Sequence, residues 1–413
     1  MDRLATTIRP YAWGSRTALP ALLGTEPTED PQAELWMGAH PGAPSGVDRG
    51  HGPQTLDQVI AADPERELGA ATVRRFGPTL PFLFKVLAAG EPLSVQVHPD
   101  LAQAKAGFVV EEARGIPLDA RERNYRDANH KPEMLCALDE FTGVCGFRRP
   151  ERTAALLERL GVPGLRPVAD VLRTKPEPEA LREALTLVLT LDQATVPALV
   201  AETGNALRRL AAEAASADEA SDEASDKASD EAVALADYAV LADHYPNDPG
   251  LLSALLLNHV VLRPGEAIYL GAGVPHAYFR GLGVELMANS DNVLRAGLTP
   301  KHIDVPELLA VVRFEATEPS VVPPQSVPDN PGEQLYPVPI DEFRLSRYEL
   351  GEWPLPTGTP QIVLCTSGQA TLTDEAGQRL TLSPGQSCFI PADNPPVTAT
   401  GSATTLFRAT VTL

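Results

Sequence analysis

The stretch "PGEAIYLGAGVPHAYF", residues 264–279, returns in outline 120 residues later as "PGQSCFIPADNPPVTA", residues 384–399. In both copies a Pro-Gly pair precedes a short apolar run, and a second cluster of turn-forming residues ends that run. Short apolar runs bounded by Pro and Gly are typical of β-strands joined by turns. Pro396 stands in the second copy where His276 stands in the first, so only the first copy offers a polar ligand there.

Strand, Pro-Gly turn, strand and a closing Pro-x-His segment together resemble the second motif of the cupin fold, a small double-sheet jelly roll. The chain has 413 residues, enough for two or three domains with their own cores. We therefore expect a mainly β fold, in which two cupin-like jelly-roll barrel units are accompanied by an α-helical domain inserted into the first.

Changes in composition along the chain predict the domain boundaries. Residues 1–150 and 248–317 are rich in strand and turn signals and form the two parts of the first, catalytic barrel, while 318–413 form a C-terminal barrel without metal. Residues 151–247 have helical apolar spacing and form the insertion.

The sequence also predicts the local structure of three segments near these boundaries. The acidic low-complexity stretch 216–232 contains the tandem repeat "ASDEASDKASDEA" and is either a solvated helix extension or a disordered loop. Residues 299–314 are predicted to be a helix, with Thr299 as its cap and Pro300 in its first turn. The Pro-rich segment 318–333 is predicted to be a linker.

Composition also indicates which partners the protein does not bind and in which cellular compartment it works. A net charge of −21 disfavours binding to nucleic acid and to anionic membranes. No apolar signal core begins the sequence, and the apolar stretch 251–262 is too short to span a bilayer. The four cysteines form no CxxC pair and sit in apolar contexts, which is typical of buried thiols in a reducing compartment. We expect a cytoplasmic protein.

Candidate metal ligands fall on segments that the pattern predicts to be strands. In "PLSVQVHP" (92–99), Ser94, Gln96 and His98 share one face of an extended strand, because side chains alternate with a period of two. Glu133 in "NHKPEM" and His276 complete a set of two imidazoles, a carboxylate and an amide. Such a set suits zinc or another divalent first-row metal and leaves room for water or substrate.

Several segments, in order, resemble type I mannose-6-phosphate isomerases, which belong to the cupin superfamily. They are "YAWGS" (11–15), "ELWMGAHP" (34–41), "PFLFKVL" (81–87), "LSVQVHPD" (93–100), "NHKPEM" (129–134), "GVPHAY" (273–278) and "SDNVLRAGLTPK" (290–301). The resemblance implies that Gln96, His98, Glu133 and His276 bind one Zn²⁺ per chain. It implies an aldose–ketose isomerase that interconverts mannose 6-phosphate and fructose 6-phosphate by moving a proton between C1 and C2 through an enediol.

The resemblance also implies that Arg295, the arginine of the family's "VRAG" segment, lies in the active site. We expect Arg295, Glu285 and Lys131 to handle protons and stabilise charge. Only six lysines occur, and Lys85, Lys131 and Lys301 all lie in the signature segments, as a phosphate grip in an acidic protein requires. The residues expected to bind substrate are Lys85, Ser94, Tyr278, Lys301 and Trp13.

Two alternatives stay open from the sequence. One is another metal-dependent cupin enzyme, such as an oxygenase that uses a 2-His-1-carboxylate set. The other is a non-catalytic sugar-phosphate-binding protein. For the isomerase we expect a small sugar phosphate as the partner and a monomeric chain, and the identity of the general base is left undecided.

Overall fold

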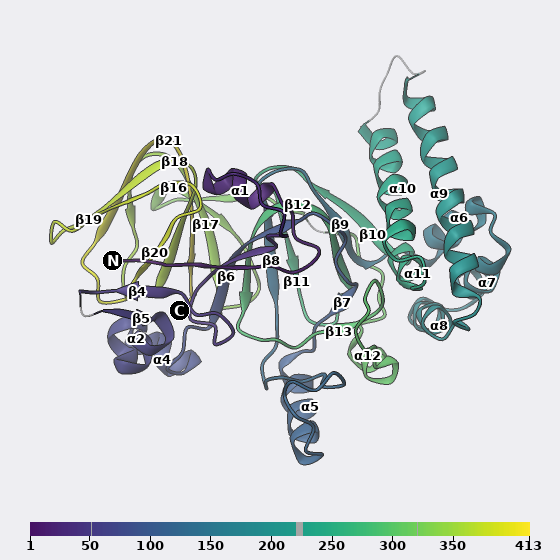
Figure 1. Ribbon diagram of the computed structural model, residues 1–413, viewed down its shortest axis with the longest axis horizontal. Helices are drawn as coiled ribbons and strands as arrows, with labels where there is room; N and C mark the ends of the chain where they lie inside the picture. Colours follow the sequence, from purple (N-terminus) through teal and green to yellow (C-terminus); the bar gives the residue numbers. More distant parts are fainter. Residues whose placement is uncertain (51, 220–225, 320) are drawn as a thin grey trace.

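The computed structural model describes residues 1–413 except 51, 220–225 and 320. Two antiparallel barrels lie side by side, and a bundle of helices covers the far side of the first barrel (Figure 1). In the described residues the strands form an 11-stranded sheet, an 8-stranded sheet and a two-stranded ribbon. The prediction of a mainly β protein with a helical insertion is confirmed.

The 11-stranded sheet forms the first barrel, and β12 (His276–Ala288) is its central strand. β12 pairs with β7 and β9 at its beginning and with β6 and β8 over its later half, so segments far apart in the sequence meet along it. The other members are β2 (Thr7–Arg9), β3 (Glu34–Met37), β6 (Phe82–Ala89), β7 (Gln96–Val97), β8 (Glu133–Ala137), β9 (Phe141–Phe147), β10 (Leu257–Leu262), β11 (Ala267–Leu270), β13 (Leu294–Arg295) and β14 (Val321–Val322).

The 8-stranded sheet forms the second barrel. Its members are β1 (Asp2–Arg3), β15 (Gln325–Val327), β16 (Asn330–Tyr336), β17 (Arg344–Leu355), β18 (Gln361–Asp374), β19 (Arg379–Leu382), β20 (Ser387–Ile390) and β21 (Val397–Thr410). β1 comes from the start of the chain and pairs with β20, near its end. The ribbon consists of β4 (Gly46–Asp48) and β5 (Pro53–Thr55). The expected linker 318–333 contributes β14 to the first barrel and β15 and part of β16 to the second.

The repeated sequence corresponds to a repeated structure. β11 and β20 occupy the same positions in their copies, and β12 and β21 begin at or next to His276 and Pro396. The turn before each strand places its glycine at positive φ, 88° at Gly265 and 77° at Gly385, where a side chain would be strained. The two barrels therefore share this strand–turn–strand unit.

The two longest described helices lie in the insertion. The helices in or beside the barrels are α1 (Ala18–Leu23), α2 (Leu56–Ala62), α3 (Pro64–Leu68), α4 (Ala70–Phe76), α5 (Leu101–Ala113) and α12 (Val305–Val311). The helices of the insertion run past its predicted bounds of 151–247, and the helical insertion is therefore taken as residues 150–255. It contains α6 (Pro150–Leu160), the 3₁₀ turn Pro163–Leu165, α7 (Arg166–Thr174), α8 (Glu177–Leu189), α9 (Val196–Glu219), α10 (Asp226–His244) and α11 (Gly250–Leu255). α9 and α10 extend into the acidic stretch 216–232, whose residues 220–225 lie outside the described part of the chain.

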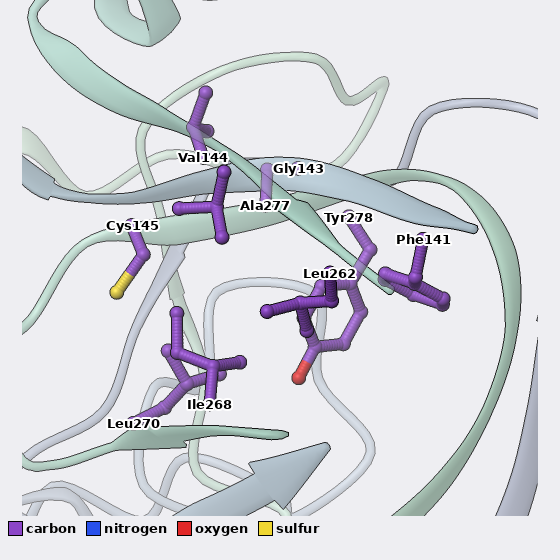
Figure 2. A pocket seen from close by; sticks show the side chains of 10 residues that line it. Phe141, Gly143, Val144, Cys145, Leu262, Ile268, Leu270, Ala277 and Tyr278 are labelled. Carbon is purple, nitrogen blue, oxygen red and sulfur yellow. The ribbon is translucent and has the colours of Figure 1, made fainter. Parts of the chain in front are cut away.

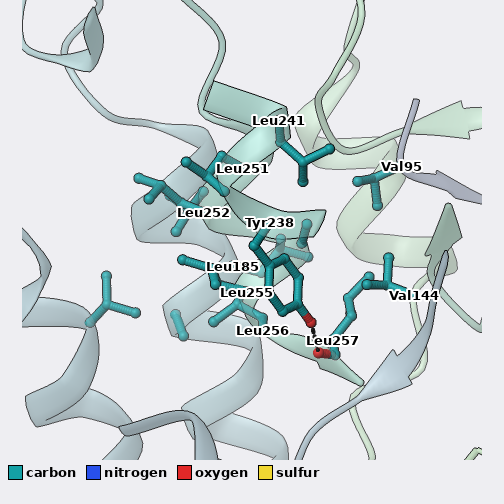
Figure 3. Close-up of a cluster of buried hydrophobic side chains, with 14 of the residues drawn as sticks. Val95, Val144, Leu185, Tyr238, Leu241, Leu251, Leu252, Leu255, Leu256 and Leu257 are labelled. Atoms are coloured by element: carbon teal, nitrogen blue, oxygen red, sulfur yellow. Dashed lines mark hydrogen bonds between the residues drawn. The ribbon is translucent and has the colours of Figure 1, made fainter. Parts of the chain in front are cut away.

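One apolar core joins the insertion to the first barrel. Val95 and Val144, on barrel strands or beside them, face Leu241 and Leu255 of the insertion (Figure 3). The hydroxyl of Tyr238 on α10 donates a hydrogen bond of 3.1 Å to the carbonyl oxygen of Leu257, at the start of β10. The insertion is thus packed against the strands that lead to the repeat.

A second apolar core joins the two barrels. Phe84 and Met134 of the first barrel belong to the same buried cluster as Phe343 and Phe389 of the second. All four side chains are fully buried. Burial of large apolar side chains is the main favourable term in folding, so each barrel stabilises the other.

The prediction of a helix over 299–314 is wrong at its start, because α12 begins at Val305. Asp304 is the cap, and its carboxylate accepts a hydrogen bond of 3.1 Å from the Glu307 amide. Pro306 occupies the first turn, where its missing N–H costs nothing. Leu298, with φ of 56°, turns the chain away from helical geometry before this point.

No described helix is both long enough and apolar enough to cross a membrane.

Candidate active site

Three of the predicted metal ligands meet at one point in the first barrel. His98 follows β7, Glu133 begins β8 and His276 begins β12. His98 Nε2 lies 3.5 Å from Glu133 Oε1, and His276 Nε2 lies 3.4 Å from Glu133 Oε2. The three side chains are almost completely buried, and one ligand atom of each lies within 4.8 Å of the others. Two imidazoles and one carboxylate at this spacing can hold a metal ion.

Backbone carbonyls orient both imidazoles toward this point. His98 Nδ1 is 2.8 Å from the Asn292 carbonyl oxygen, and His276 Nδ1 is 3.0 Å from that of Val274. Each Nδ1 therefore carries the proton and donates it, which leaves the Nε2 lone pairs facing Glu133. His98 Nε2 is a buried atom without a hydrogen-bond partner among the described residues. A bound cation would satisfy it.

The electrostatics keep these ligands in the forms that metals bind. Burial lowers the pKa of His98 to about 4, so the ring is neutral near pH 7. Burial alone would raise the pKa of Glu133, but Lys131 and the two histidines hold it well below its usual range. Lys131 Nζ lies 3.1 Å from Glu133 Oε1, as expected for two residues on one face of an extended segment.

Gln96, the fourth predicted ligand, lies next to this group. It is paired in the sheet register with His276 on one side and with Arg295 on the other. The predicted alternation along its segment is confirmed: Val95 and Val97 are buried in the core against the insertion, while Ser94 and Gln96 line a large cavity.

That cavity has a volume of about 650 Å³ and is lined by Gln96, which pairs with His276 in the sheet, and by Lys131, which contacts Glu133. It is also lined by the predicted site residues Trp13, Lys85, Lys131, Arg295 and Lys301. Seven basic side chains line it against four acidic ones; the basic ones are Lys85, Arg121, Arg123, Arg126, Lys131, Arg295 and Lys301. In a chain of net charge −21, this balance marks a site for an anion.

Three of these cations lie close enough together to influence one another. Among the described residues, none makes an ion pair with Arg126, Arg295 or Lys301. Burial and the Arg126 charge lower the pKa of Arg295, and burial together with Arg295 and Arg126 lowers that of Lys301. Mutual repulsion without a carboxylate partner is relieved by a bound anion.

Lys85 and Glu285 form a buried ion pair beside the cavity. They are directly opposite each other on β6 and β12, with Lys85 Nζ 2.8 Å from Glu285 Oε2 and 3.6 Å from Glu34 Oε1. Burial would lower the pKa of Lys85, but the two carboxylates raise it, so Lys85 stays charged. Burial raises the pKa of Glu285. Lys85 lines the cavity, whereas Glu285 lies behind it.

Tyr278, predicted to bind substrate, does not line this cavity. Its ring lies among the apolar side chains of Phe141, Leu262 and Ile268, and it meets Phe141 edge to face at 5.2 Å between ring centroids (Figure 2). Burial, with Glu285 and Glu133 nearby, raises the pKa of its hydroxyl well above the usual value. Tyr278 therefore packs in the apolar interior next to His276, with 6.1 Å between ring centroids, and outside the cavity lining.

Sequence reasoning missed Arg126 and the two other arginines of its loop. The signal was present, because "RERNYR" (121–126) places three arginines immediately before the "NHKPEM" segment. The loop is fixed by the Asn292 side chain, whose Oδ1 accepts a hydrogen bond of 2.7 Å from the Arg126 amide. Nothing local in the sequence shows that this loop folds over the cavity.

Comparison with known proteins identifies the family. Residues 1–150 match the model of the phosphomannose isomerase type I catalytic domain, and residues 334–410 match that of the mannose-6-phosphate isomerase cupin domain. The chain is 42% identical over 405 residues to the mannose-6-phosphate isomerase of Escherichia coli (strain K12), covering 97% of both chains. The chain belongs to the type I mannose-6-phosphate isomerase family. A plant member of the family, mannose-6-phosphate isomerase 1 of Arabidopsis thaliana, is 31% identical over 99% of this chain and 93% of its own.

Solved structures of the mannose-6-phosphate isomerase family share the whole fold. A zinc-bound mannose 6-phosphate isomerase superposes with a TM-score of 0.86 at 38% identity, over 100% of this chain and 99% of the other. A mutant phosphomannose isomerase from Salmonella typhimurium gives a TM-score of 0.87 at 39% identity over 100% of both chains. The expected cupin architecture is thus confirmed.

Proposed function

We propose that this protein is a zinc-dependent aldose–ketose isomerase that interconverts mannose 6-phosphate and fructose 6-phosphate. One observation carries the proposal: the group His98, Glu133 and His276 adjoins, through Gln96 and Lys131, a cavity with three further cations. These cations, which form no ion pair with any described residue, are Arg126, Arg295 and Lys301. A sugar phosphate has the matching chemistry, with hydroxyl and carbonyl oxygens at one end and a dianion at the other.

Zinc fits the residues present. His98 and His276 offer neutral Nε2 atoms, Glu133 offers an ionised carboxylate, and Gln96 on the adjoining strand is proposed as the fourth ligand. The family's solved members include zinc-bound structures. When bound, zinc supplies a Lewis acid that stabilises negative charge on substrate oxygens. One zinc per chain is expected, because Pro396 replaces the histidine in the second barrel.

The reaction moves a proton between C1 and C2, which we propose proceeds through an enediol. Lys131, which contacts Glu133, and Arg295, which pairs with Gln96 in the sheet, both line the cavity, so both can donate hydrogen bonds to the reacting oxygens. Glu285 is proposed to act through Lys85, since its carboxylate holds that ammonium at the cavity wall.

The rest of the cavity is proposed to bind the sugar and its phosphate. Lys301 and Arg295, with Arg126, offer charged hydrogen bonds to the phosphate oxygens. Trp13 provides an aromatic face and Ser94 a hydroxyl along the same wall. Cytoplasmic location and a monomeric state stay predictions.

A coupled assay with mannose 6-phosphate, run beside metal analysis of the purified protein, tests the function. We expect turnover, including under anaerobic conditions, with about one zinc per chain. Turnover that requires oxygen would support an oxygenase instead. Binding of the sugar phosphate without turnover would indicate a non-catalytic binding protein.

A further inference from the structure

The loop between Arg295 and Lys301 has a strained backbone at its centre. Leu298 has φ of 56°, and Ala403 is the only other described non-glycine residue with positive φ. The left-handed region costs a residue such as leucine about 1–2 kcal/mol, so other contacts must hold Leu298 there. The loop carries a cavity-lining cation at each end, so its conformation sets where both cations lie.

A single carboxylate from the helical insertion holds this loop. Asp248 lies between α10 and α11, and its Oδ1 accepts hydrogen bonds from the Leu298 amide at 2.8 Å and from the Gly250 amide at 2.7 Å. Its Oδ2 accepts a third from the Thr299 amide at 3.1 Å. Hydrogen bonds from amides to an ionised acceptor are stronger than those between neutral groups, so together they can offset the backbone strain.

The backbones of the loop and of the insertion touch directly. A methyl group added at Gly250 would lie 2.2 Å from the Leu298 nitrogen, and one added at Gly297 would lie 2.3 Å from the Gly250 Cα. No side chain fits between them, so the distance from Asp248 to the loop is fixed by backbone contact.

The other side of the loop is fastened to the strand segment that carries Ser94 and Gln96. The Ala296 amide donates to the Val95 carbonyl at 2.9 Å, and the Val95 amide donates to the Gly297 carbonyl at 3.1 Å. The loop is therefore held between the metal-ligand segment and Asp248, and Asp248 is its side-chain anchor on the insertion.

We propose that Asp248 is a positioning residue for the anion end of the cavity. It keeps Leu298 in the left-handed conformation in which Arg295 and Lys301 face one space, and so it sets the affinity for the phosphate group but not for the metal. The inference rests on the proposed function and gives the helical insertion a part in substrate binding.

The test compares Asp248→Ala and Asp248→Asn with the unmodified protein. Inorganic phosphate is titrated calorimetrically into the metal-loaded protein, and KM, kcat and bound zinc are measured beside it. We expect Asp248→Ala to weaken phosphate binding and raise KM about tenfold, with unchanged zinc content, because both cations shift from their binding positions. Asp248→Asn keeps one carbonyl acceptor for the amides and is expected to show a smaller loss.

Asp192→Ala is the matched control, because Asp192 likewise accepts a backbone hydrogen bond, from Ala194 at 3.0 Å, in a turn of the insertion away from the cavity. It should change none of the four quantities. Unchanged phosphate affinity in a folded Asp248→Ala variant, or parallel loss of zinc and phosphate, would overturn the proposal. If Asp248→Ala does not fold, wild-type phosphate affinity in Asp248→Asn overturns it. An unmodified protein that neither binds phosphate nor turns over sugar phosphates contradicts the proposed function instead.

Discussion

His130 of the first barrel meets Glu342 of the second, with 2.7 Å between Nε2 and Oε1. His130 lies three residues before the ligand Glu133, and Glu342 lies just before β17. Both side chains are largely buried. The contact therefore ties the segment that carries Lys131 and Glu133 to the barrel that has no metal-ligand histidine of its own.

This contact predicts a pH dependence of stability. The hydrogen bond from His130 lowers the pKa of Glu342 below its ordinary value of 4.5, so the ionised form stabilises the fold. That contribution is fully present above the unfolded pKa and is lost as pH falls through the folded one. We expect Glu342→Gln to cost about 1 kcal/mol of unfolding free energy at pH 6, and the difference to vanish near pH 3.

Urea denaturation of both proteins across this pH range measures the effect. Asp341→Asn is the control, since Asp341 pairs with Arg75 on the surface between the same two barrels. If the difference in unfolding free energy between Glu342→Gln and the unmodified protein grows as pH falls, the ionised form of Glu342 does not stabilise the fold.

Removal of a ligand should remove the metal. We expect His276→Ala to bind well under one zinc per chain and to lose activity at least roughly 100-fold, because an imidazole of a three-residue buried group is gone. His244→Ala, at the exposed end of α10, should keep both its bound zinc and its activity. Metal analysis and the coupled assay check this, and a full zinc complement in His276→Ala would disprove the ligand assignment.

Chelation provides a separate test without mutation. We expect the chelator-treated protein to lose isomerase activity and to recover it when zinc is added back, because the buried Nε2 of His98 is then satisfied again. Activity that survives complete removal of metal would show that these residues do not hold an essential ion.

The buried pair of Lys85 and Glu285 should matter for folding as well as for activity. In Lys85→Ala, Glu285 and Glu34 would be buried without a cation, and we expect a loss of about 3–5 kcal/mol of unfolding free energy. Lys175→Ala is the matched surface control, since Lys175 pairs with two exposed glutamates, and should cost less than about 1 kcal/mol. Chemical denaturation compares them, and equal losses would mean that burial of the pair has no effect.

Arg126 should contribute to substrate affinity. We expect Arg126→Ala to raise KM about tenfold and to weaken the dependence of KM on salt, because one of three unpaired cations is lost. Arg152→Ala removes an exposed arginine far from the cavity and should leave KM unchanged. Steady-state kinetics at two ionic strengths decide between a binding role and a purely structural one, in which kcat and KM would change without any salt effect.

The sequence alone predicted the features that follow from the alternation of polar and apolar residues in strands and from turn-forming residues. The alternation of Gln96 with Val95 and Val97 placed polar and apolar side chains on the correct faces, and the Pro-Gly turns at Gly265 and Gly385 marked the repeated unit. The start of α12 was missed because Thr299 and Pro300 look like a helix start, while the Asp304 cap and the left-handed Leu298 place that start at Val305.

The features of the site that the sequence did not predict depend on contacts between segments that are distant in the chain. The return of Arg126 over the cavity depends on Asn292, which is 166 residues away. Likewise, no pattern near Asp248 shows that its carboxylate meets the amides of Leu298 and Thr299. Such pairings follow from the tertiary fold and have no local period.

The pairing of β1 with β20 has a consequence for how the chain is made. Asp2 and Arg3 leave the ribosome long before their partners, Phe389 and Cys388. During synthesis this edge strand has nothing to pair with, and exposed strand edges favour association with other chains. The second barrel can complete this pairing only after residues 388 and 389 have emerged, so we expect nascent chains stalled before residue 388 to depend on chaperones.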